Sequence, residues 1–487
     1  MTGDHGRHCN GKQEGTMSII RVSKAFFVSV SLLACAGAMG VQAAALDDWV
    51  PWRSFAVEDY PANAQAGKAV ALSTDWLAIG VPGDIDSVGS TLSTQSGAVL
   101  IYQWASGGWQ LRHDVHLSDV GGTPRSNAHF GAALALSGDR LLVGCPGCDF
   151  GWHGVLLDLS ASGSPPVALP IALLGAEEEV SDPDLGAGSA VALDGTLFAI
   201  GSPLAQPFGA GGQIGVVDIG HLDANGVTWD HTFSGEQAGS RFGAALALEV
   251  IDGGGTIPTR TTWLAVGAPA YVNNGSISIA GRAYLYRDTS STDWNHVQIF
   301  ANPQSGLADA LGKAVAITFE QADGSIGGEG LFAVGAPGRA FNGITSGAVQ
   351  IYRTATTNGT FAPEQEIGLT DGETFDRFGS ALALLPTTLL VGANGRDVDL
   401  AGEAGAAFRF ERSHAGPQPQ WPLRQTLLAR GGNEAFGAAV AMASSRGAAI
   451  GAPDSSIGDT GAVHLYLCDG IFINGFDNHN GVLCDRF

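Results

Sequence analysis

The sequence predicts an all-β fold, a seven-bladed β-propeller built from four-stranded antiparallel blades. Three observations predict it. A phrase of small and apolar residues recurs seven times, an apolar segment that ends in glycine follows each copy, and a strand without a partner stands ahead of the first copy. Repeats of this size are typical of folds in which each unit buries its apolar faces against the next unit.

Residues 1–45 are expected to be an upstream extension followed by a secretory signal peptide. Arg21 and Lys24 precede the apolar run "AFFVSVSLLACAGAMG", and the small residues of "VQAAA" follow it, which is the pattern of an export signal. The polar residues 1–16 fit no such pattern, so we place the natural start at Met17. The apolar run is short for a spanning helix, and no transmembrane span is expected in the mature chain.

The leader can end in two ways. Small residues favour cleavage after Ala43 or Ala45, which gives a chain without a lipid anchor. The alternative is a lipoprotein, because "LLAC" resembles a lipidation motif that would make Cys35 the lipidated end.

The segment "WRSFAVEDY" (52–60) has the pattern of a fourth strand with no unit ahead of it. The seventh unit has three clear strands and stops at Cys468. We therefore expect the N-terminal strand to complete the last blade, and the propeller to span residues 46–467.

The first strand of each unit is the recurring phrase, at intervals of 55 to 69 residues. The copies are "AGKAVAL" (66–72), "FGAALAL" (130–136), "AGSAVAL" (187–193), "FGAALAL" (242–248), "LGKAVAI" (311–317), "FGSALAL" (378–384) and "FGAAVAM" (436–442). A second strand such as "LLVGCPG" or "FAVGAPG" follows each copy. Both strands are almost free of polar residues, so we expect them to be buried on both faces. Radial closure hides every such face, whereas a linear solenoid would need polar caps.

Four of the six cysteines lie beyond the leader. An even number in an exported chain predicts two disulfides, and proximity pairs Cys145 with Cys148 and Cys468 with Cys484. The alternative for "CPGC" is a redox dithiol or half of a zinc site, but no second cysteine pair stands at zinc-ribbon spacing. The tail 468–487 lies outside the repeats and is expected to be closed by its disulfide.

The charge balance restricts the partners. The chain has 24 Lys+Arg against 47 Asp+Glu, a formal net charge of -23. This argues against nucleic acids and anionic membranes, and it permits cationic ligands or metal ions. We expect a monomer that binds an extracellular protein or glycan.

The phrase F-G followed by V-G-A-P resembles the FG-GAP repeat, the unit of the integrin α-subunit N-terminal propeller and of many exported bacterial proteins. The resemblance covers about residues 50–467 and implies extracellular binding or cell adhesion. The tail segment "IFINGFD" is similar to a short ending of exported proteins in some Gram-negative bacteria. This implies a protein that is secreted, periplasmic or on the outer surface of such a cell.

Many members of this family bind calcium in loops with acidic residues at alternating positions before a glycine, a pattern that supplies oxygen ligands. No full D-x-D-x-D-G occurs here. Partial matches give two calcium candidates, Asp84 with Asp86 in "DIDSVG" and Asp397 with Asp399 in "DVDLAG". The competing interpretation is that these are solvated turn acids.

A second candidate for ligand contact is the loop "DFGWHG", which presents Trp152 and His153 beside the predicted disulfide. Trp152 could instead pack over that disulfide. His113 and His116 have metal-like spacing, but residues i and i+3 of a strand point to opposite faces, so we interpret them as exposed strand residues.

We expect a protein without catalytic activity. Neither H-E-x-x-H nor G-x-S-x-G is present, which excludes the zincin and α/β-hydrolase motifs. Two alternatives are kept. A lectin-like propeller would need a polar and aromatic pattern repeated in the loops, and a hydrolase would need polar residues that converge on the central channel.

Overall fold

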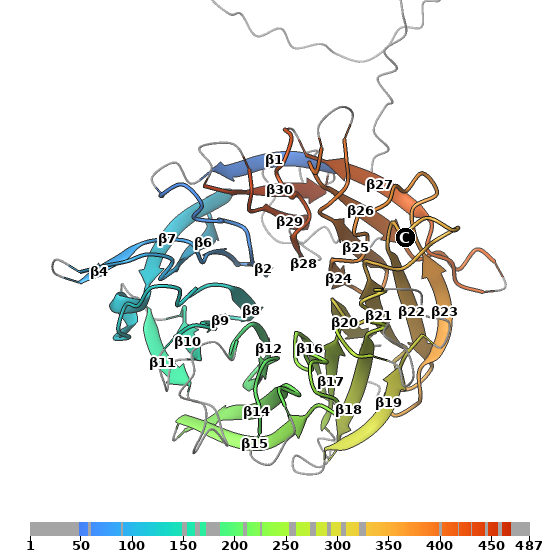
Figure 1. Ribbon diagram of the computed structural model, residues 1–487, viewed down its shortest axis with the longest axis horizontal. Helices are drawn as coiled ribbons and strands as arrows, with labels where there is room; N and C mark the ends of the chain where they lie inside the picture. The colour runs from blue at the N-terminus through green and yellow to red at the C-terminus, as the bar shows by residue number, and fades with distance from the viewer. Residues whose placement is uncertain are drawn as a thin grey trace, which may run out of the picture. The chain divides into compact units, whose positions relative to one another are not determined.

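The computed structural model consists of seven four-stranded antiparallel sheets, which are the blades of a β-propeller (Figure 1). The predicted fold class is therefore confirmed. All described residues belong to the compact unit Ala45–Phe487. The structure describes residues 48–468 except 57–59, 89–90, 149–152, 161–165, 172–185, 208–211, 225, 253–259, 273–278, 290–293, 303–307, 321–327, 399–401, 417, 430, 444–446 and 456–459.

Six blades are continuous in the chain and run from the innermost strand outward. They are blade 1, β2 (Val70–Leu72), β3 (Trp76–Val81), β6 (Ala98–Ala105), β7 (Gly108–His116); blade 2, β8 (Ala133–Ser137), β9 (Arg140–Gly144), β10 (Gly154–Asp158), β11 (Val167–Ile171); blade 3, β12 (Ala190–Asp194), β13 (Leu197–Ser202), β14 (Val216–Asp223), β15 (Gly226–Ser234); blade 4, β16 (Ala245–Asp252), β17 (Arg260–Ala268), β18 (Arg282–Asp288), β19 (Asn295–Phe300); blade 5, β20 (Val315–Phe319), β21 (Gly330–Ala336), β22 (Ala348–Thr354), β23 (Ala362–Ile367); and blade 6, β24 (Ala381–Leu384), β25 (Thr388–Ala393), β26 (Ala406–Glu411), β27 (Leu423–Leu428).

Blade 7 is made from both ends of the repeat region. Its strands are β28 (Ala439–Ala443), β29 (Gly447–Ala452), β30 (Ala462–Cys468) and β1 (Trp49–Ala56), and β1 pairs antiparallel with β30 from Trp49↔Cys468 to Ala56↔Ala462. The expected closure by the N-terminal strand is thus present. A short hairpin, β4 (Asp86–Val88) and β5 (Thr91–Ser93), and a 3₁₀ turn, η1 (Leu117–Val120), complete the described elements. Among the described residues no helix is long and apolar enough to cross a membrane.

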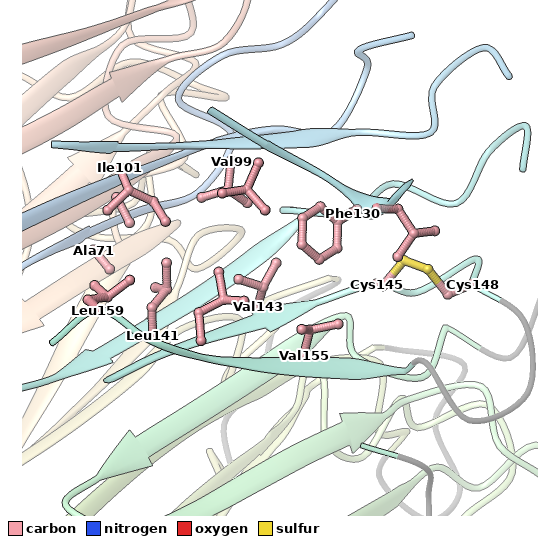
Figure 2. Close-up of a cluster of buried hydrophobic side chains, with 14 of the residues drawn as sticks. Ala71, Val99, Ile101, Phe130, Leu141, Val143, Cys145, Cys148, Val155 and Leu159 are labelled. Carbon is pink, nitrogen blue, oxygen red and sulfur yellow. A yellow bond between two sulfur atoms is a disulfide. The ribbon is translucent and has the colours of Figure 1, made fainter. Parts of the chain in front are cut away.

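The innermost strands form a closed ring. Each of β2, β8, β12, β16, β20, β24 and β28 contacts the next, and β28 contacts β2 (Figure 1). The apolar cores lie between neighbouring blades. Figure 2 shows the core in which Val99 and Ile101 of blade 1 pack against Phe130, Leu141 and Val143 of blade 2. Every blade therefore needs both of its neighbours to bury its two faces.

Two glycines of each repeat explain why the phrase recurs. The glycine in the second strand of one blade lies against the carbonyl oxygen of the F-G glycine in the next. A Cβ on Gly80 would stand 2.0 Å from the Gly131 oxygen, and a Cβ on Gly451 would stand 1.9 Å from the Gly67 oxygen. The second of these contacts joins blade 7 to blade 1. Only glycine permits so close an approach of two backbones.

The expectation that both inner strands are buried on both faces is correct for the second strands and for the first strands β2, β12 and β20, but not for the other four first strands. The second strands are buried along nearly their whole length, whereas side chains of β8, β16, β24 and β28 are half-buried. These first strands are the innermost of their blades, so solvent reaches them at the centre of the ring. Small side chains such as alanine leave that centre open.

Candidate functional site

The FG turn, which leads into the first strand of each blade, has an unusual backbone. The residue directly before the first residue of the phrase has a positive φ in all seven blades, and this φ is 50° to 59° at the six residues that are not glycine. These residues are Gln65, His129, Gly186, Arg241, Ala310, Arg377 and Ala435. Positive φ is uncommon outside glycine. One hydrogen bond closes every turn, as from the Lys68 N–H to the Gln65 carbonyl.

Four cationic side chains project from these turns. Lys68 and Lys313 follow the F-G glycine in blades 1 and 5, and Arg241 and Arg377 precede the phenylalanine in blades 4 and 6. All four are exposed. Within the described part of the chain none of them takes part in an ion pair. We call the face of the ring that carries the FG turns the FG face.

The charge of Lys68 acts on Lys313 although their blades are not neighbours. The surrounding protein lowers the pKa of Lys313, and the charges of Lys68 and Arg241 lower it further. The sequence reasoning missed these residues, but a signal was present. The chain has four lysines, two lie before residue 25, and the other two occupy the same position of the repeat.

The buried acids of the FG turns, by contrast, are paired. Asp309 accepts hydrogen bonds from Asn302 at 2.9 Å and from Arg339 at 3.3 Å. Asp376 accepts a bond of 2.7 Å from Arg396. Their negative charges are matched inside the blade, and the exposed cations of the same turns are left available to a ligand.

The FG turn of blade 6 also presents an aromatic side chain. Phe375 is 73% exposed and has a φ of 76°. A positive φ recurs at the equivalent position of the other described turns, at Asn63, Asn127, Gly239, Ala308 and Asn433, so this backbone conformation belongs to the repeat. Blade 6 differs in placing an exposed phenylalanine there. Arg377, exposed and with a φ of 59°, lies two residues further on.

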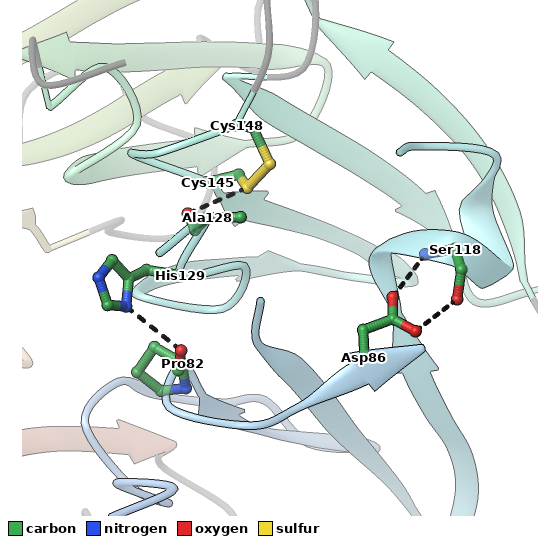
Figure 3. Close-up of a disulfide and its surroundings, with 7 residues drawn as sticks. All are labelled: Pro82, Asp86, Ser118, Ala128, His129, Cys145 and Cys148. Carbon is green, nitrogen blue, oxygen red and sulfur yellow. Dashed lines mark hydrogen bonds between the residues drawn. A yellow bond between two sulfur atoms is a disulfide. The ribbon is translucent and has the colours of Figure 1, made fainter. Parts of the chain in front are cut away.

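The first calcium candidates lie on the FG face but are bonded to protein groups. Asp84 and Asp86 are buried. Asp84 Oδ2 is 2.9 Å from His116 Nε2, and the two carboxylate oxygens of Asp86 accept bonds from the Ser118 hydroxyl at 2.9 Å and the Ser118 N–H at 3.1 Å (Figure 3). Calcium would have to displace these donors.

In the second candidate pair, Asp397 Oδ1 accepts the Glu403 N–H at 2.7 Å, and Asp399 lies outside the described residues. Among the residues that the structure describes, no group of three or more His, Cys, Asp or Glu could hold a metal ion. Calcium binding by the four aspartates stays a prediction.

His116 is not the simple exposed strand residue that its position in the sequence indicated. Its side chain is half-buried and contacts Asp84, while its N–H donates to Asp119 Oδ2 at 2.9 Å. The hydrogen bond to Asp84 raises the pKa of His116 to about 9. The imidazolium therefore neutralises part of the acidic charge at this edge of the FG face.

A disulfide joins Cys145 to Cys148 at the end of β9, and both cysteines are buried (Figure 3). Burial disfavours the redox alternative, because an exchanging thiol must be reached by its partner. The expectation that His153 is exposed is wrong, because the residue is only 5% exposed and burial lowers its pKa. Ligand contact by His153 stays a prediction. Trp152 lies outside the described residues, as do Cys484 and the side chain of Cys468.

Carboxylates at the opposite end of the inner strands link one blade to the next. Three backbone N–H groups donate to a side chain of the preceding blade: Gly195 to Ser137 Oγ at 2.9 Å, Val250 to Asp194 Oδ2 at 2.8 Å, and Phe319 to Glu249 Oε1 at 3.4 Å. Burial raises the pKa of Glu249 to about 8, and the Asp194 carboxylate contributes to the rise. These bonds assign the two acids a structural role between blades.

Asp218 on β14 gives a prediction of pH-dependent stability. It is 1% exposed, and burial raises its pKa from 3.8 to about 7, although the Thr232 hydroxyl donates to it. The native state thus binds the proton more tightly than the unfolded chain, so this contribution to stability is complete below pH 3.8 and is lost as the pH rises towards 7. The displaced pKa corresponds to an upper limit of ~4 kcal/mol.

We expect Asp218→Asn to unfold at a higher temperature than the natural chain at pH 8 and to gain little at pH 4. The asparagine can keep a hydrogen bond with Thr232 but carries no charge to bury. Thermal unfolding of both chains at the two pH values measures the difference. An equal difference in unfolding temperature at the two pH values would contradict the raised pKa of Asp218.

The comparisons with known proteins bear on the fold. A family model described as the FG-GAP repeat matches residues 362–410, which run from β23 of blade 5 to the end of β26 in blade 6. Residues 362–410 therefore contain an FG-GAP repeat, and the seven-bladed structure fits an FG-GAP repeat propeller. The other blades have the same strand order and the same glycine contacts as the matched segment. A search of curated protein sequences finds no significant match.

Several solved structures resemble the propeller at low identity. They are the periplasmic gluconolactonase of Pseudomonas aeruginosa (12% identity, TM-score 0.42, covering 74% of this chain and 85% of that one), an ulvan lyase of a new polysaccharide lyase family (11%, 0.41, 86% and 96%), and Sqt1 of Chaetomium thermophilum (13%, 0.38, 83% and 94%). Likenesses at this level assign no activity to the chain.

Proposed function

We propose that this FG-GAP propeller is an exported, non-catalytic binding protein that recognises an extracellular protein or glycan through its FG face. The FG turn of blade 6 carries the proposal. It places an exposed Phe375 two residues from an exposed arginine, Arg377, that is in no ion pair with a described residue. Aromatic and arginine side chains supply most of the binding energy in protein interfaces.

The inter-blade architecture supports a binding role. The closed ring holds each FG turn on a rigid inner strand, and loops on a rigid scaffold are the usual place of recognition. Among the exported compartments, the proposal favours the cell surface or the medium, where an adhesive partner is available. The leader that would direct export lies within residues 1–45, outside the described part of the chain.

A hydrolase at the central opening is a second candidate. Glu249, half-buried with a pKa near 8, is the observation in its favour, because a carboxyl with a raised pKa can act as a general acid. Glu249 and Asp194 each accept a backbone N–H from the next blade. Both carboxyl groups are therefore engaged in holding the next blade, which favours the binding role over hydrolysis.

The test is a binding screen of the purified chain against extracellular proteins and a glycan array, in calcium and in EDTA. We expect Phe375→Ser and Arg377→Gln each to weaken binding of the ligand by about tenfold or more. Leu423→Ser is the matched control, because Leu423 is also an exposed apolar residue (50%) but lies on the outer strand β27. Loss of binding in calcium-free buffer would support the aspartate candidates. Equal affinity of Phe375→Ser and the natural chain would contradict the proposed surface.

A further inference from the structure

The two lysines of the described chain are placed alike in turns that face each other. The Lys68 N–H donates to the Gln65 carbonyl at 3.1 Å, and the Lys313 N–H donates to the Ala310 carbonyl at 3.1 Å. Each lysine stands two residues before an innermost strand, β2 or β20. These two strands face each other across the centre of the ring (Figure 1).

The two ammonium groups converge on the centre. Blades 6 and 7 separate blade 5 from blade 1 in the closed ring, yet the charge of Lys68 acts on Lys313. Both side chains must therefore reach over the central opening. Arg241 of blade 4 joins them from the neighbouring FG turn.

No described carboxylate neutralises this group. All three residues are exposed and absent from the ion pairs of the described chain. The acids of the FG turns in blades 5 and 6 are bonded to arginines. In a chain of net charge -23, three converging cations without a counter-charge form a local site that attracts anions.

We propose that Lys68, Lys313 and Arg241 bind an anionic group with several charged oxygens, a sulfate or carboxylate group of an acidic glycan, over the central opening. This inference rests on the proposed function and names the chemical class of the ligand. Ammonium and guanidinium groups form strong charge-assisted hydrogen bonds with such oxygens.

Exposed carboxylates elsewhere on the FG face already have cationic partners. Asp371 lies 2.9 Å from Arg396, and Glu236 lies 3.1 Å from Arg282. These acids therefore offer no counter-charge to Lys68, Lys313 and Arg241.

The test uses the mature chain, which begins after Ala45, with its amines methylated by ¹³C-formaldehyde so that each gives an NMR signal. Sodium sulfate is titrated against sodium chloride of equal ionic strength. We expect the Lys68 and Lys313 signals, assigned with Lys68→Gln and Lys313→Gln, to shift with sulfate, and the signal of the N-terminal amine to stay. Equal responses of the two lysines and the N-terminal amine would overturn the site.

An acidic glycan array then tests the ligand class. The double variant Lys68→Gln/Lys313→Gln should lose about tenfold or more in affinity for sulfated or uronic oligosaccharides. Arg112→Gln is the matched control, because Arg112 is exposed on β7 and its guanidinium donates to the neutral side chain of Gln103 at 3.0 Å. Arg112→Gln should bind as the natural chain does.

The array distinguishes the two proposals. Binding of neutral glycans or proteins that the double variant retains would overturn the anionic ligand and keep the proposed function. Sulfate-dependent lysine shifts without binding of any glycan or protein would keep the anion site and overturn the proposed function.

Discussion

Gly335→Ala is expected to disrupt the contact between blades 5 and 6 and to destabilise the whole propeller. A Cβ at this position would stand 2.0 Å from the carbonyl oxygen of Gly379 and 3.0 Å from its carbonyl carbon. Both groups are backbone, so no side-chain rotation relieves the clash. Overpacking of a rigid interior costs 1–3 kcal/mol or more, and here we expect about 3 kcal/mol or more because two blades must separate.

The thermal midpoint of the purified variant measures this effect. Gly416→Ala is the matched control, because its Cβ would meet only the Gln418 oxygen at 3.7 Å, an ordinary contact. Gly416 also lacks a positive φ, so alanine can adopt its conformation. Equal midpoints for the two variants would show that the recurring glycine is not required by the inter-blade contact.

The same contact shows why the fold could be predicted from the sequence. The glycines of the F-G and G-A-P phrases recur because each blade needs them for the next, so a local phrase encodes a long-range contact. The N-terminal strand had no partner in its own unit, and the last unit lacked a fourth strand. Together these two observations predicted that the N-terminal strand completes the last blade. The prediction of the repeated blades and the prediction of the ring closure both depend on sequence patterns that the backbone geometry requires.

The candidate site could be predicted less well, because it depends on which side chains meet across the ring. Lys68 and Lys313 belong to blades 1 and 5, which are not neighbours. The sequence therefore does not show that the charge of one lysine acts on the other. One signal was available within the repeats. Aspartate stands two residues before the first residue of the phrase only in the units whose second strand ends in G-A-P-G-R or G-A-N-G-R, and these aspartates pair with Arg339 and Arg396.

His153 shows the opposite limitation. A polar residue in a loop next to a strand was expected to face solvent, but the start of β10 is packed between blades, and the histidine is buried with it. Turn composition indicates that a loop exists. It does not indicate which of its residues the neighbouring blade covers.

Deletion of residues 49–56 is expected to have the largest effect on the propeller, because it removes the strand that closes blade 7. Trp49 of β1 is 4% exposed, and its backbone exchanges two hydrogen bonds with the Gln425 side chain of blade 6, at 2.9 and 2.8 Å. Phe55 is 5% exposed and packs on Tyr102 of blade 1, with ring centroids 4.6 Å apart. One strand thus contacts both neighbouring blades.

Loss of these two buried aromatic side chains alone would cost roughly 6 kcal/mol. The deletion also exposes the edge of β30, whose unpaired backbone groups would favour association with another chain. We expect a lower thermal midpoint and oligomers in size-exclusion chromatography.

A synthetic peptide of residues 46–60 separates loss of the strand from general misfolding. Because β1 is held by pairing with β30 and by side chains of two blades, the peptide should restore the monomer and raise the midpoint by mass action. A peptide with Trp49→Ser and Phe55→Ser should not. Equal effects of the two peptides would mean that backbone pairing alone closes the ring, and no effect of either would mean that closure requires the covalent connection.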